Sequence, residues 1–429
     1  MSSPFVVREH VFDGQHIRQY AAALSTDQED VLQLHAKSYT PREVEDGSIR
    51  GDFTVIAYHA NAFPKECYEP FFETLYSRLK FHNNLTIGSI WIADQAFQNK
   101  SAGLNDERLG NDFHWWDHSR DILQMVNVFR KQMRRPIIAI GHSAGATQAV
   151  MTAHYHPRLF EAIIMIDPPM TMTVAETAGA IIKYALSKPS TFDTREAAAD
   201  FVRKDPFFGK WEPEPLQRYI DHAFRESPTV LHPEPNKTKP FTNVHLEIRG
   251  TVRPNMANIK PNRPFSDMER HNYPDISLQS PLVGPVYNPQ TRDAYANLKT
   301  LRPTALFIHG EGSKIVPEDE KDHRVVITGT EVGGNGGEAA GNVTAVTIPG
   351  GHMLPQVNVT GTAVAAADWI GVWMGRFRKT EDLFASTQVQ KTKREKQMMD
   401  QEVEQTLRKW DGKPWRNHLA EPDGGRSKL

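Results

Sequence analysis

The sequence predicts an α/β protein: a mostly parallel sheet of eight strands with helices on both faces. Short runs rich in Val and Ile alternate with longer amphipathic segments, an order that gives parallel strands joined by right-handed helical crossovers. One run ends in Gly141-His142-Ser143-Ala144-Gly145 and passes directly into a helical pattern. A strand that turns sharply into a helix at Gly-x-Ser-x-Gly is typical of a nucleophile elbow. The two observations indicate a doubly wound sheet that presents Ser143 at one edge.

Two antiparallel strands open the predicted sheet, because apolar and polar residues alternate within residues 8–40. The strands that follow are continuous apolar runs, as expected for parallel strands buried on both faces. We place them at residues 53–58, 87–93, 136–140, 162–166, 304–308 and 343–348, with helical patterns around 71–79, 122–129 and 144–155 between them. A final helix carries Ile370, Trp373 and Phe377 at close to helical spacing.

The regular alternation stops between about residues 171 and 300. Three short helical patterns, around 175–186, 194–204 and 214–225, lead into an irregular stretch rich in Pro, Asn and Arg. An insertion that follows the sixth strand starts at the active-site edge of the sheet, where it is well placed to form a cap or lid. We therefore expect four parts: a first core part at 1–170, a cap insertion at 171–300, a second core part at 301–378 and a charged C-terminal arm at 379–429.

The composition argues against several classes of function. The net charge is -2 over 429 residues, and acidic and basic residues are mixed along most of the chain, so we expect no nucleic-acid partner. No apolar run reaches the ~18 residues that a transmembrane segment needs, and the first residues lack the pattern of a signal peptide. Cys67 is the only cysteine, which excludes an intrachain disulfide and fits a reducing compartment.

The last three residues, Ser427-Lys428-Leu429, match the targeting tripeptide that the peroxisomal import receptor reads at a free C-terminus. We therefore expect the protein in the peroxisome matrix, with the import receptor as a partner. The alternative interpretation is an arbitrary polar tail.

A serine nucleophile needs a base and an orienting acid, and α/β-hydrolases supply them in the chain order Ser, Asp or Glu, His. His352 follows the last predicted strand in Pro349-Gly350-Gly351-His352, where two glycines let the loop bring a histidine back over the sheet edge. We therefore predict an α/β-hydrolase fold in which Ser143 is the nucleophile and His352 the general base.

The acid of the triad is less obvious. In the loop after the seventh strand, its usual place, Ser313 stands where an aspartate is expected, and Glu311 lies two residues earlier on a glycine-flanked turn. Asp167 ends the sixth strand, one helix-plus-strand unit after Ser143, so a right-handed crossover puts it on the neighbouring parallel strand, ~5 Å across the sheet. We favour Asp167 over Glu311. The structural alternative for Asp167 is a cap of the proline turn that follows it.

Acyl transfer also needs hydrogen-bond donors for the oxyanion. One predicted donor is the backbone N–H of Ala144, directly after the nucleophile. The second is the N–H of Asn61, in the loop after the third strand, where Ala60 replaces the usual glycine.

We predict no metal ion and no cofactor. His114 and His118 stand four residues apart, a spacing that zinc can use on a helix, but no third ligand accompanies them. The start of a helix is the simpler interpretation.

These motifs resemble those of the fungal peroxisomal α/β-hydrolases, among them the mycophenolic acid acyl-CoA hydrolases. The resemblance rests on the elbow, the segment from His59 to Glu66, residues 115–123, Asp167-Pro168 and the terminal Ser-Lys-Leu. It covers about residues 8–378 and is weaker in the insertion. Yeast peroxisomal lipase and fungal toxin-biosynthesis hydrolases are similar at a greater distance. In this family the acid follows the sixth strand, so the resemblance also implies Asp167.

The resemblance implies hydrolysis of an acyl-CoA thioester, of a fatty acid or a secondary metabolite, with the insertion covering the acyl group. A carboxylic ester hydrolase or lipase is the alternative and would use the same triad. A non-catalytic interaction protein that works through its charged arm is a further alternative, and the sequence leaves a homodimer open.

Overall fold

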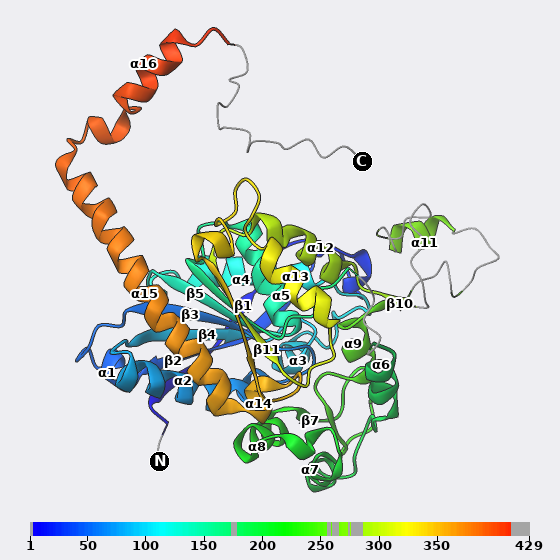
Figure 1. Ribbon diagram of the computed structural model, residues 1–429. Coiled ribbons are helices and arrows are strands. Elements are labelled where there is room, and N and C mark those ends of the chain that lie inside the picture. Colours follow the sequence, from blue (N-terminus) through cyan, green and yellow to red (C-terminus); the bar gives the residue numbers. More distant parts are fainter. Residues whose placement is uncertain are drawn as a thin grey trace, which may run out of the picture. The chain divides into compact units, whose positions relative to one another are not determined.

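Figure 1 shows the chain as a computed structural model, in which residues 3–172, 178–254, 259, 266–272, 275 and 286–412 are described. The chain divides into two units, Met1–Gly371 and Val372–Leu429. The predicted targeting tripeptide, Ser427-Lys428-Leu429, lies outside the described residues. It therefore stays a sequence-based prediction.

The predicted sheet is confirmed, with eight strands in the order β1-β2-β4-β3-β5-β6-β11-β12. β1 and β2 pair antiparallel, β2 joins β4 antiparallel, and all later pairings are parallel. The strands are β1 (Phe5–Asp13), β2 (Gln33–Pro41), β3 (Phe53–Tyr58), β4 (Ile87–Ala93), β5 (Ile137–His142), β6 (Ala162–Ile166), β11 (Thr304–Gly310) and β12 (Val343–Ile348). The six parallel strands share one carboxyl edge, and the loops that leave this edge carry the predicted site residues.

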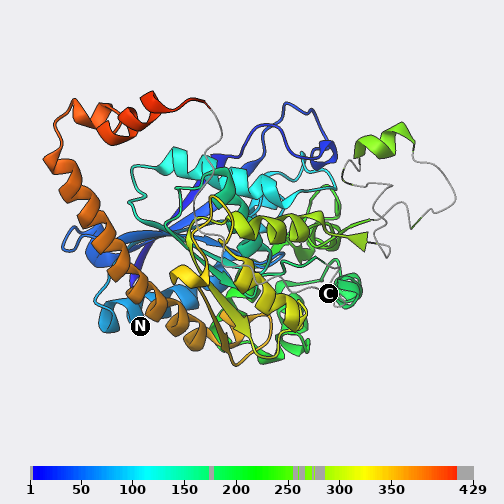
Figure 2. The same ribbon diagram turned by 45° about the horizontal axis from the view of Figure 1, so that its top comes forward.

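Helices lie on both sides of this sheet, as Figures 1 and 2 show. The three helical patterns expected between the strands are confirmed as α2, α4 and α5. The helices that begin in the first unit are α1 (Arg42–Glu45), α2 (Glu69–His82), α3 (Asn99–Leu104), α4 (Trp115–Phe129), α5 (Ala144–Tyr155), α6 (Ala178–Ser187), α7 (Arg195–Lys204), α8 (Pro213–His222), α9 (Val244–Arg249), α11 (Asp267–Asn272), α12 (Pro289–Asn297), α13 (Glu318–Ile327), α14 (Leu354–Val357) and α15 (Val359–Gln390).

Alternate residues of the central strands bury against different helices. Ile56 and Met165 belong to the main core cluster, together with side chains of α4, α5 and α12. Their neighbours Val55 and Ile164 are also fully buried but lie outside that cluster. Successive side chains of a strand point to opposite faces, so a run of consecutive apolar residues supplies both cores.

The insertion after β6 contains α6, α7 and α8, close to the three expected helical patterns. The third pattern was expected to reach residue 225 but ends at His222, because a short strand begins two residues later. The stretch expected to be irregular holds two short antiparallel pairs, β7 with β8 and β9 with β10. These strands are β7 (Phe224–Glu226), β8 (Thr238–Pro240), β9 (Arg253–Pro254) and β10 (Val286–Tyr287).

The last helix within the expected insertion packs with the core. Ala294 and Leu298, in and directly after α12, belong to the same core cluster as α4 and α5. We therefore propose that the insertion ends before Pro289 rather than at residue 300.

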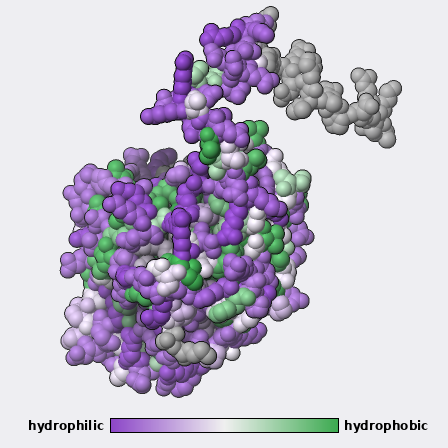
Figure 3. Space-filling model, turned by 90° about the vertical axis from the view of Figure 1, so that its left-hand side faces the viewer, coloured by the Kyte–Doolittle hydropathy of each residue, from purple (hydrophilic) through white to green (hydrophobic). Residues whose placement is uncertain are grey.

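The second unit holds the end of α15 and a further helix, α16 (Gln401–Lys409). Asp400 caps α16, because its side chain accepts hydrogen bonds from the N–H groups of Glu402 and Val403. Over residues 379–412, almost all side chains are exposed. The surface in Figure 3 is mainly hydrophilic, with apolar residues in scattered small groups. None of the described helices combines the length and apolar character of a transmembrane segment.

Candidate active site

The elbow between β5 and α5 holds Ser143 in a strained backbone conformation. Its φ of 54° and ψ of -126° fall where residues other than glycine are rarely found. A Cβ on Gly141 would lie 2.5 Å from the Cα of Ala146, and one on Gly145 would lie 2.6 Å from the carbonyl oxygen of His59. Glycine at both positions is therefore required for this turn, which explains the Gly-x-Ser-x-Gly pattern.

Ser143, His352 and Asp167 form one hydrogen-bonded chain at the carboxyl edge of the sheet. His352 Nε2 lies 2.8 Å from Ser143 Oγ, and His352 Nδ1 lies 2.6 Å from Asp167 Oδ2. With the proton on Nδ1, the imidazole donates to the carboxylate and accepts from the hydroxyl. The structure thus brings these three sequence-predicted residues together, in the connectivity of a Ser-His-Asp triad.

The Asp167 carboxylate receives hydrogen bonds from two further groups. Ser313 Oγ donates to Oδ2 at 2.5 Å, and the N–H of Gly310 donates to Oδ1 at 3.4 Å. Burial favours the neutral acid, but His352 and these two donors outweigh it and lower the pKa of Asp167 below its ordinary value. Ser313 occupies the usual position of the acid, in the loop after β11, and its hydroxyl donates to Asp167, which we predict to be the acid here. Glu311 is exposed, and the hydrogen bonds of His352 go to Asp167 and Ser143 instead.

The loop after β3 leaves one amide free. The N–H of Ala60 donates to Tyr68 Oη at 2.8 Å, and the N–H of Ala62 donates to Gln98 Oε1 at 2.7 Å. Between them, the N–H of Asn61 has no hydrogen-bond partner among the described residues.

Ala144 supplies a second free amide. It is the first residue of α5, so its N–H has no acceptor within the helix, and the rest of the described chain offers it none. Asn61 and Ala144 line the same cavity as Ser143 and His352. Free amides beside a serine hydroxyl are the arrangement that an oxyanion site requires.

The Asn61 side chain ties this loop to the insertion, a contact that the sequence did not reveal. Its Nδ2 donates to the Glu247 carbonyl at 3.0 Å and to Thr251 Oγ1 at 2.9 Å, while its Oδ1 accepts from Gln98 Nε2 at 2.5 Å. The packing is close, since a Cβ on Gly250 would lie 2.2 Å from Asn61 Oδ1. No hydrophobic period or short motif links such distant segments, so no signal in the single sequence could have indicated this contact.

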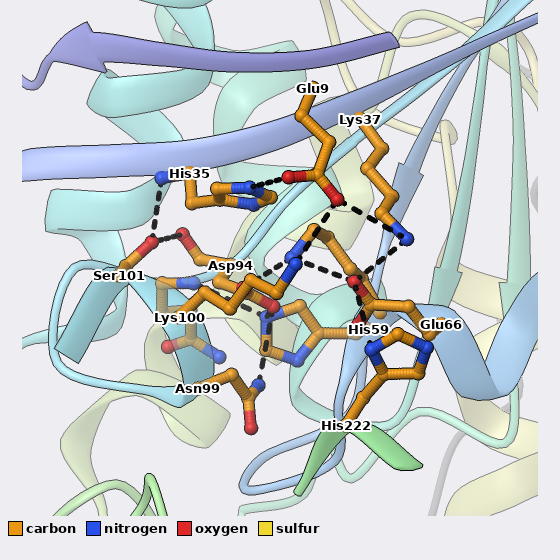
Figure 4. A network of polar contacts seen from close by, with 12 residues as sticks. Glu9, His35, Lys37, His59, Glu66, Asp94, Asn99, Lys100, Ser101 and His222 are labelled. Atoms are coloured by element: carbon orange, nitrogen blue, oxygen red, sulfur yellow. Dashed lines mark hydrogen bonds and ion pairs between the residues drawn. The ribbon is translucent and has the colours of Figure 1, made fainter. Parts of the chain in front are cut away.

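A buried ionic network adjoins the same loop (Figure 4). Lys65 Nζ lies 2.5 Å from Asp94 Oδ2 and 3.3 Å from Glu66 Oε1, and Lys65 is fully buried. Asn99 Nδ2 donates both to Asp94 and to the carbonyl of Phe63. Breaking a buried ion pair of this kind strands a charge away from water, at a cost of several kcal/mol. The network therefore holds the loop firmly in one conformation.

A cavity of about 1300 Å³ opens at the triad. The core lines it at Ser143 and His352, and the insertion adds aromatic rings. Tyr184 and Phe207 stack with ring centres 5.3 Å apart, and Phe63 stacks on Phe207 at 6.0 Å. The volume exceeds the roughly 300–1,000 Å³ of ordinary ligand pockets, so the site has room for a bulky ligand.

His114 and His118 belong to the start of α4. His114 Nδ1 accepts a hydrogen bond from the N–H of Trp116 and so caps the helix. His118 is buried within the core side of the same helix. Across the described ranges, no three His, Cys, Asp or Glu side chains are grouped so as to hold a metal ion.

Comparisons with known proteins agree with this geometry. The model of the alpha/beta hydrolase fold family matches residues 89–323. The chain is 34% identical over 402 residues to the type I acyl-CoA thioesterase mpaH' of Penicillium brevicompactum, which covers 88% of this chain and 90% of that protein. It is also 34% identical over 404 residues to mpaH of Penicillium roqueforti, with 89% and 90% covered. The resemblance expected from the motifs is thereby confirmed.

Among solved structures, the peroxisomal alpha-beta-hydrolase Lpx1 of Saccharomyces cerevisiae matches with a TM-score of 0.65. The match covers 91% of this chain and 99% of that one at 17% sequence identity. At this identity the likeness concerns the fold alone, and it extends over most of the chain.

Proposed function

The chain belongs to the α/β-hydrolase family and is a hydrolase, and we propose that it cleaves acyl-CoA thioesters with Ser143, His352 and Asp167 as its catalytic triad. The observation that carries this proposal is the continuous row of hydrogen bonds from the Ser143 hydroxyl through the His352 imidazole to the buried Asp167 carboxylate. Such a chain is what makes a serine hydroxyl nucleophilic at neutral pH.

In the proposed reaction, Ser143 Oγ attacks the thioester carbonyl while His352 Nε2 takes the hydroxyl proton. Asp167 holds the Nδ1 proton and stabilises the imidazolium that forms. The carbonyl oxygen becomes an oxyanion and accepts hydrogen bonds from the N–H groups of Asn61 and Ala144. Collapse of the intermediate breaks the carbon–sulfur bond, and the departing CoA thiolate receives the proton from His352. Water, activated by the same imidazole, then hydrolyses the acyl-serine and returns the enzyme to its starting state.

The thioester is favoured over an oxygen ester because relatives that match along most of the chain are named acyl-CoA thioesterases. The large cavity is consistent with a bulky acyl group held under the insertion. A carboxylic ester hydrolase or lipase would use the same triad, so the choice rests on the leaving group.

The test compares acyl-CoAs with p-nitrophenyl esters of the same acyl groups, using wild type and Ser143→Ala. We expect kcat/KM for the thioesters to exceed that for the matched esters, and Ser143→Ala to abolish both activities. Equal or faster turnover of the esters would favour the esterase. A protein that hydrolyses neither series, and whose Ser143 is not labelled by a fluorophosphonate, would instead fit the non-catalytic interaction protein.

We propose the peroxisome matrix as the location, on the strength of Ser427-Lys428-Leu429 and of one relative named as peroxisomal, Lpx1 of Saccharomyces cerevisiae. A fluorescent protein fused to the N-terminus should collect in peroxisomes, and removal of the three residues should release it into the cytosol. Cytosolic fluorescence from the full-length fusion would contradict the assignment.

A further inference from the structure

A row of hydrogen bonds joins the three loops that carry the proposed catalytic groups. The N–H of Ala60, in the loop after β3, donates to Tyr68 Oη at 2.8 Å. Tyr68 Oη lies 2.7 Å from Nδ1 of His142, the residue before the nucleophile. His142 Nε2 lies 2.8 Å from the carbonyl oxygen of His352. The row thus runs from the oxyanion loop through the elbow to the histidine loop.

The direction of every proton in this row is fixed by chemistry. A backbone N–H can only donate, so Tyr68 Oη accepts from Ala60, and it gives its own proton to His142 Nδ1 because that nitrogen is the acceptor of a neutral ring protonated at Nε2. A carbonyl can only accept, so His142 Nε2 carries the proton and donates to His352. These two requirements select a single neutral tautomer of His142, with both ring nitrogens satisfied.

The row is buried and its histidine stays neutral. Tyr68 is 3% exposed and His142 1%. Burial, together with the neighbouring imidazole of His352, lowers the pKa of His142 to about 3. At neutral pH the ring therefore keeps the one tautomer that the row needs.

His142 does not itself line the cavity, and neither does Tyr68. Neither side chain is therefore placed to touch the substrate, and each acts only through the main chain that it holds. His142 fixes the carbonyl of the residue whose imidazole faces Ser143. Tyr68 accepts the hydrogen bond of the Ala60 N–H and so holds the backbone next to Asn61. The Asn61 N–H, which has no partner among the described residues, belongs to a residue that lines the cavity.

We propose that Tyr68 and His142 are positioning residues of the hydrolytic reaction. They lock the oxyanion loop, the elbow and the histidine loop in one register, so that the imidazole and the Asn61 amide reach the reacting carbonyl together. The proposal rests on the hydrolase function proposed above. Misplacement of a catalytic group by about 1 Å costs on the order of 100-fold in rate, so the row controls kcat rather than substrate binding.

The test measures kcat and KM for an acyl-CoA in Tyr68→Phe, His142→Leu and His142→Gln, with the concentration of active sites titrated by a fluorophosphonate. Tyr58→Phe is the matched control, because Tyr58 is equally buried and its hydroxyl makes one hydrogen bond, to Thr152, within the core. We expect Tyr68→Phe and His142→Leu to lower kcat per active site by about tenfold to 100-fold with KM within twofold. His142→Gln should recover part of the loss, since its side-chain amide can still donate to the His352 carbonyl. The control should keep the wild-type kcat.

The rate of phosphonylation of Ser143 gives a second measurement that does not depend on the thioester. It should fall in the same order of variants. If wild type is phosphonylated but does not hydrolyse acyl-CoAs, the substrate assignment fails and the ranking of phosphonylation rates still decides the role of the row. Unchanged kcat and phosphonylation rate per active site in Tyr68→Phe and His142→Leu, or an equal loss in Tyr58→Phe, would overturn the proposal. A wild-type Ser143 that is never phosphonylated, in a protein without hydrolytic activity, would overturn both proposals.

Discussion

The loops at the carboxyl edge of the sheet and the insertion that shares the cavity with them are built in different ways. At the edge, the triad side chains and the loop after β3 are held by short hydrogen bonds and buried ion pairs. Where the structure describes the insertion, its helices have ten residues or fewer and its strands two or three. Its share of the cavity lining includes the rings of Tyr184, Phe207 and Phe208, and Phe207 is 37% exposed.

This difference suggests a division of labour. Rigid, fully paired groups suit a reaction in which donors and acceptors must already be in place before charge develops. A half-exposed ring such as Phe207 can turn to fit different acyl groups. We therefore expect substitutions at the sheet edge to lower kcat and substitutions in the insertion to change KM, and the kinetic predictions below test that separation.

The largest effect is expected at the acid. Asp167→Asn should lower kcat by ~10³–10⁴, because the imidazole loses the carboxylate that fixes its tautomer and stabilises its charge. Glu311→Gln, the matched control in the loop after β11, should leave kcat nearly unchanged, since Glu311 is exposed and His352 bonds to Asp167 instead. Steady-state kinetics with one acyl-CoA decide the point. A larger loss of kcat in Glu311→Gln than in Asp167→Asn would contradict the assignment of Asp167.

A second prediction moves the acid to position 313, in the loop after β11. Ser313 Oγ lies 2.5 Å from Asp167 Oδ2, so a carboxylate at position 313 can reach the volume that the native one occupies. In the Asp167→Asn background, adding Ser313→Asp should restore kcat by about tenfold or more, because a triad depends on geometry rather than on sequence position. The single Ser313→Asp variant is the control and should lose activity, since two carboxylates then crowd one imidazole. A double variant with the same kcat as Asp167→Asn would show that a carboxylate at position 313 cannot replace the one at position 167.

The sequence predicts the sheet edge better than it predicts the insertion. That Ser143, Asp167 and His352 lie at one edge of the sheet could be predicted, because each follows an apolar run that periodicity identifies as a strand, and parallel strands bring their ends to one edge. The sequence indicated an insertion after the sixth strand but not the short strand pairs β7 with β8 and β9 with β10, since segments of two or three residues carry no period.

Hydrogen bonds between segments that are distant in the sequence could not be predicted either. Tyr68 and His142 are 74 residues apart, and Asn61 and Thr251 are 190 apart. The residues of one segment do not indicate which other segment it contacts, because such hydrogen bonds depend on tertiary geometry. The free amide of Asn61 could be guessed from the family position, but not the side-chain bonds that hold it.

Acidification should weaken the core around the sheet. Burial keeps the pKa of His118 well below 6.5, and it lowers the pKa of His309 to about 4. Above pH 6.5 these rings are neutral in both the folded and unfolded states. As the pH falls below 6.5 the unfolded chain gains protons that the folded one excludes, so each ring costs up to about 1.4 kcal/mol of stability per pH unit.

Thermal unfolding at pH 7.5 and 5.5 checks this prediction. Tm should fall on acidification in wild type, and the fall should be smaller in His118→Leu, which no longer titrates. His82→Leu is the control, because it makes the same substitution at an exposed position. An identical fall in Tm for His118→Leu and wild type would exclude His118 as a cause.

In the insertion we expect a smaller effect, and on a different constant. Phe207→Ala removes a ring that lines the cavity and should raise KM for a long-chain acyl-CoA by about threefold to tenfold, equivalent to about 1 kcal/mol of lost apolar contact. Its kcat should stay within twofold of wild type. Phe201→Ala is the matched control, since Phe201 is in α7 of the same insertion but lies outside this cavity. A fall in kcat without a change in KM would contradict the proposed division of labour.

The smallest effect is expected where the two regions meet. Thr251→Val keeps the shape of the side chain but removes the oxygen that accepts from Asn61 Nδ2, which retains its bond to the Glu247 carbonyl. Because one of two hydrogen bonds survives, kcat should fall only about twofold to threefold, with KM unchanged. Thr291→Val is the control, since Thr291 also lines the cavity but bonds to Asn288. Equal kinetics for the two variants would mean that the insertion and the oxyanion loop act independently. A specific loss in Thr251→Val would mean that the insertion also helps to set the amide that receives the oxyanion.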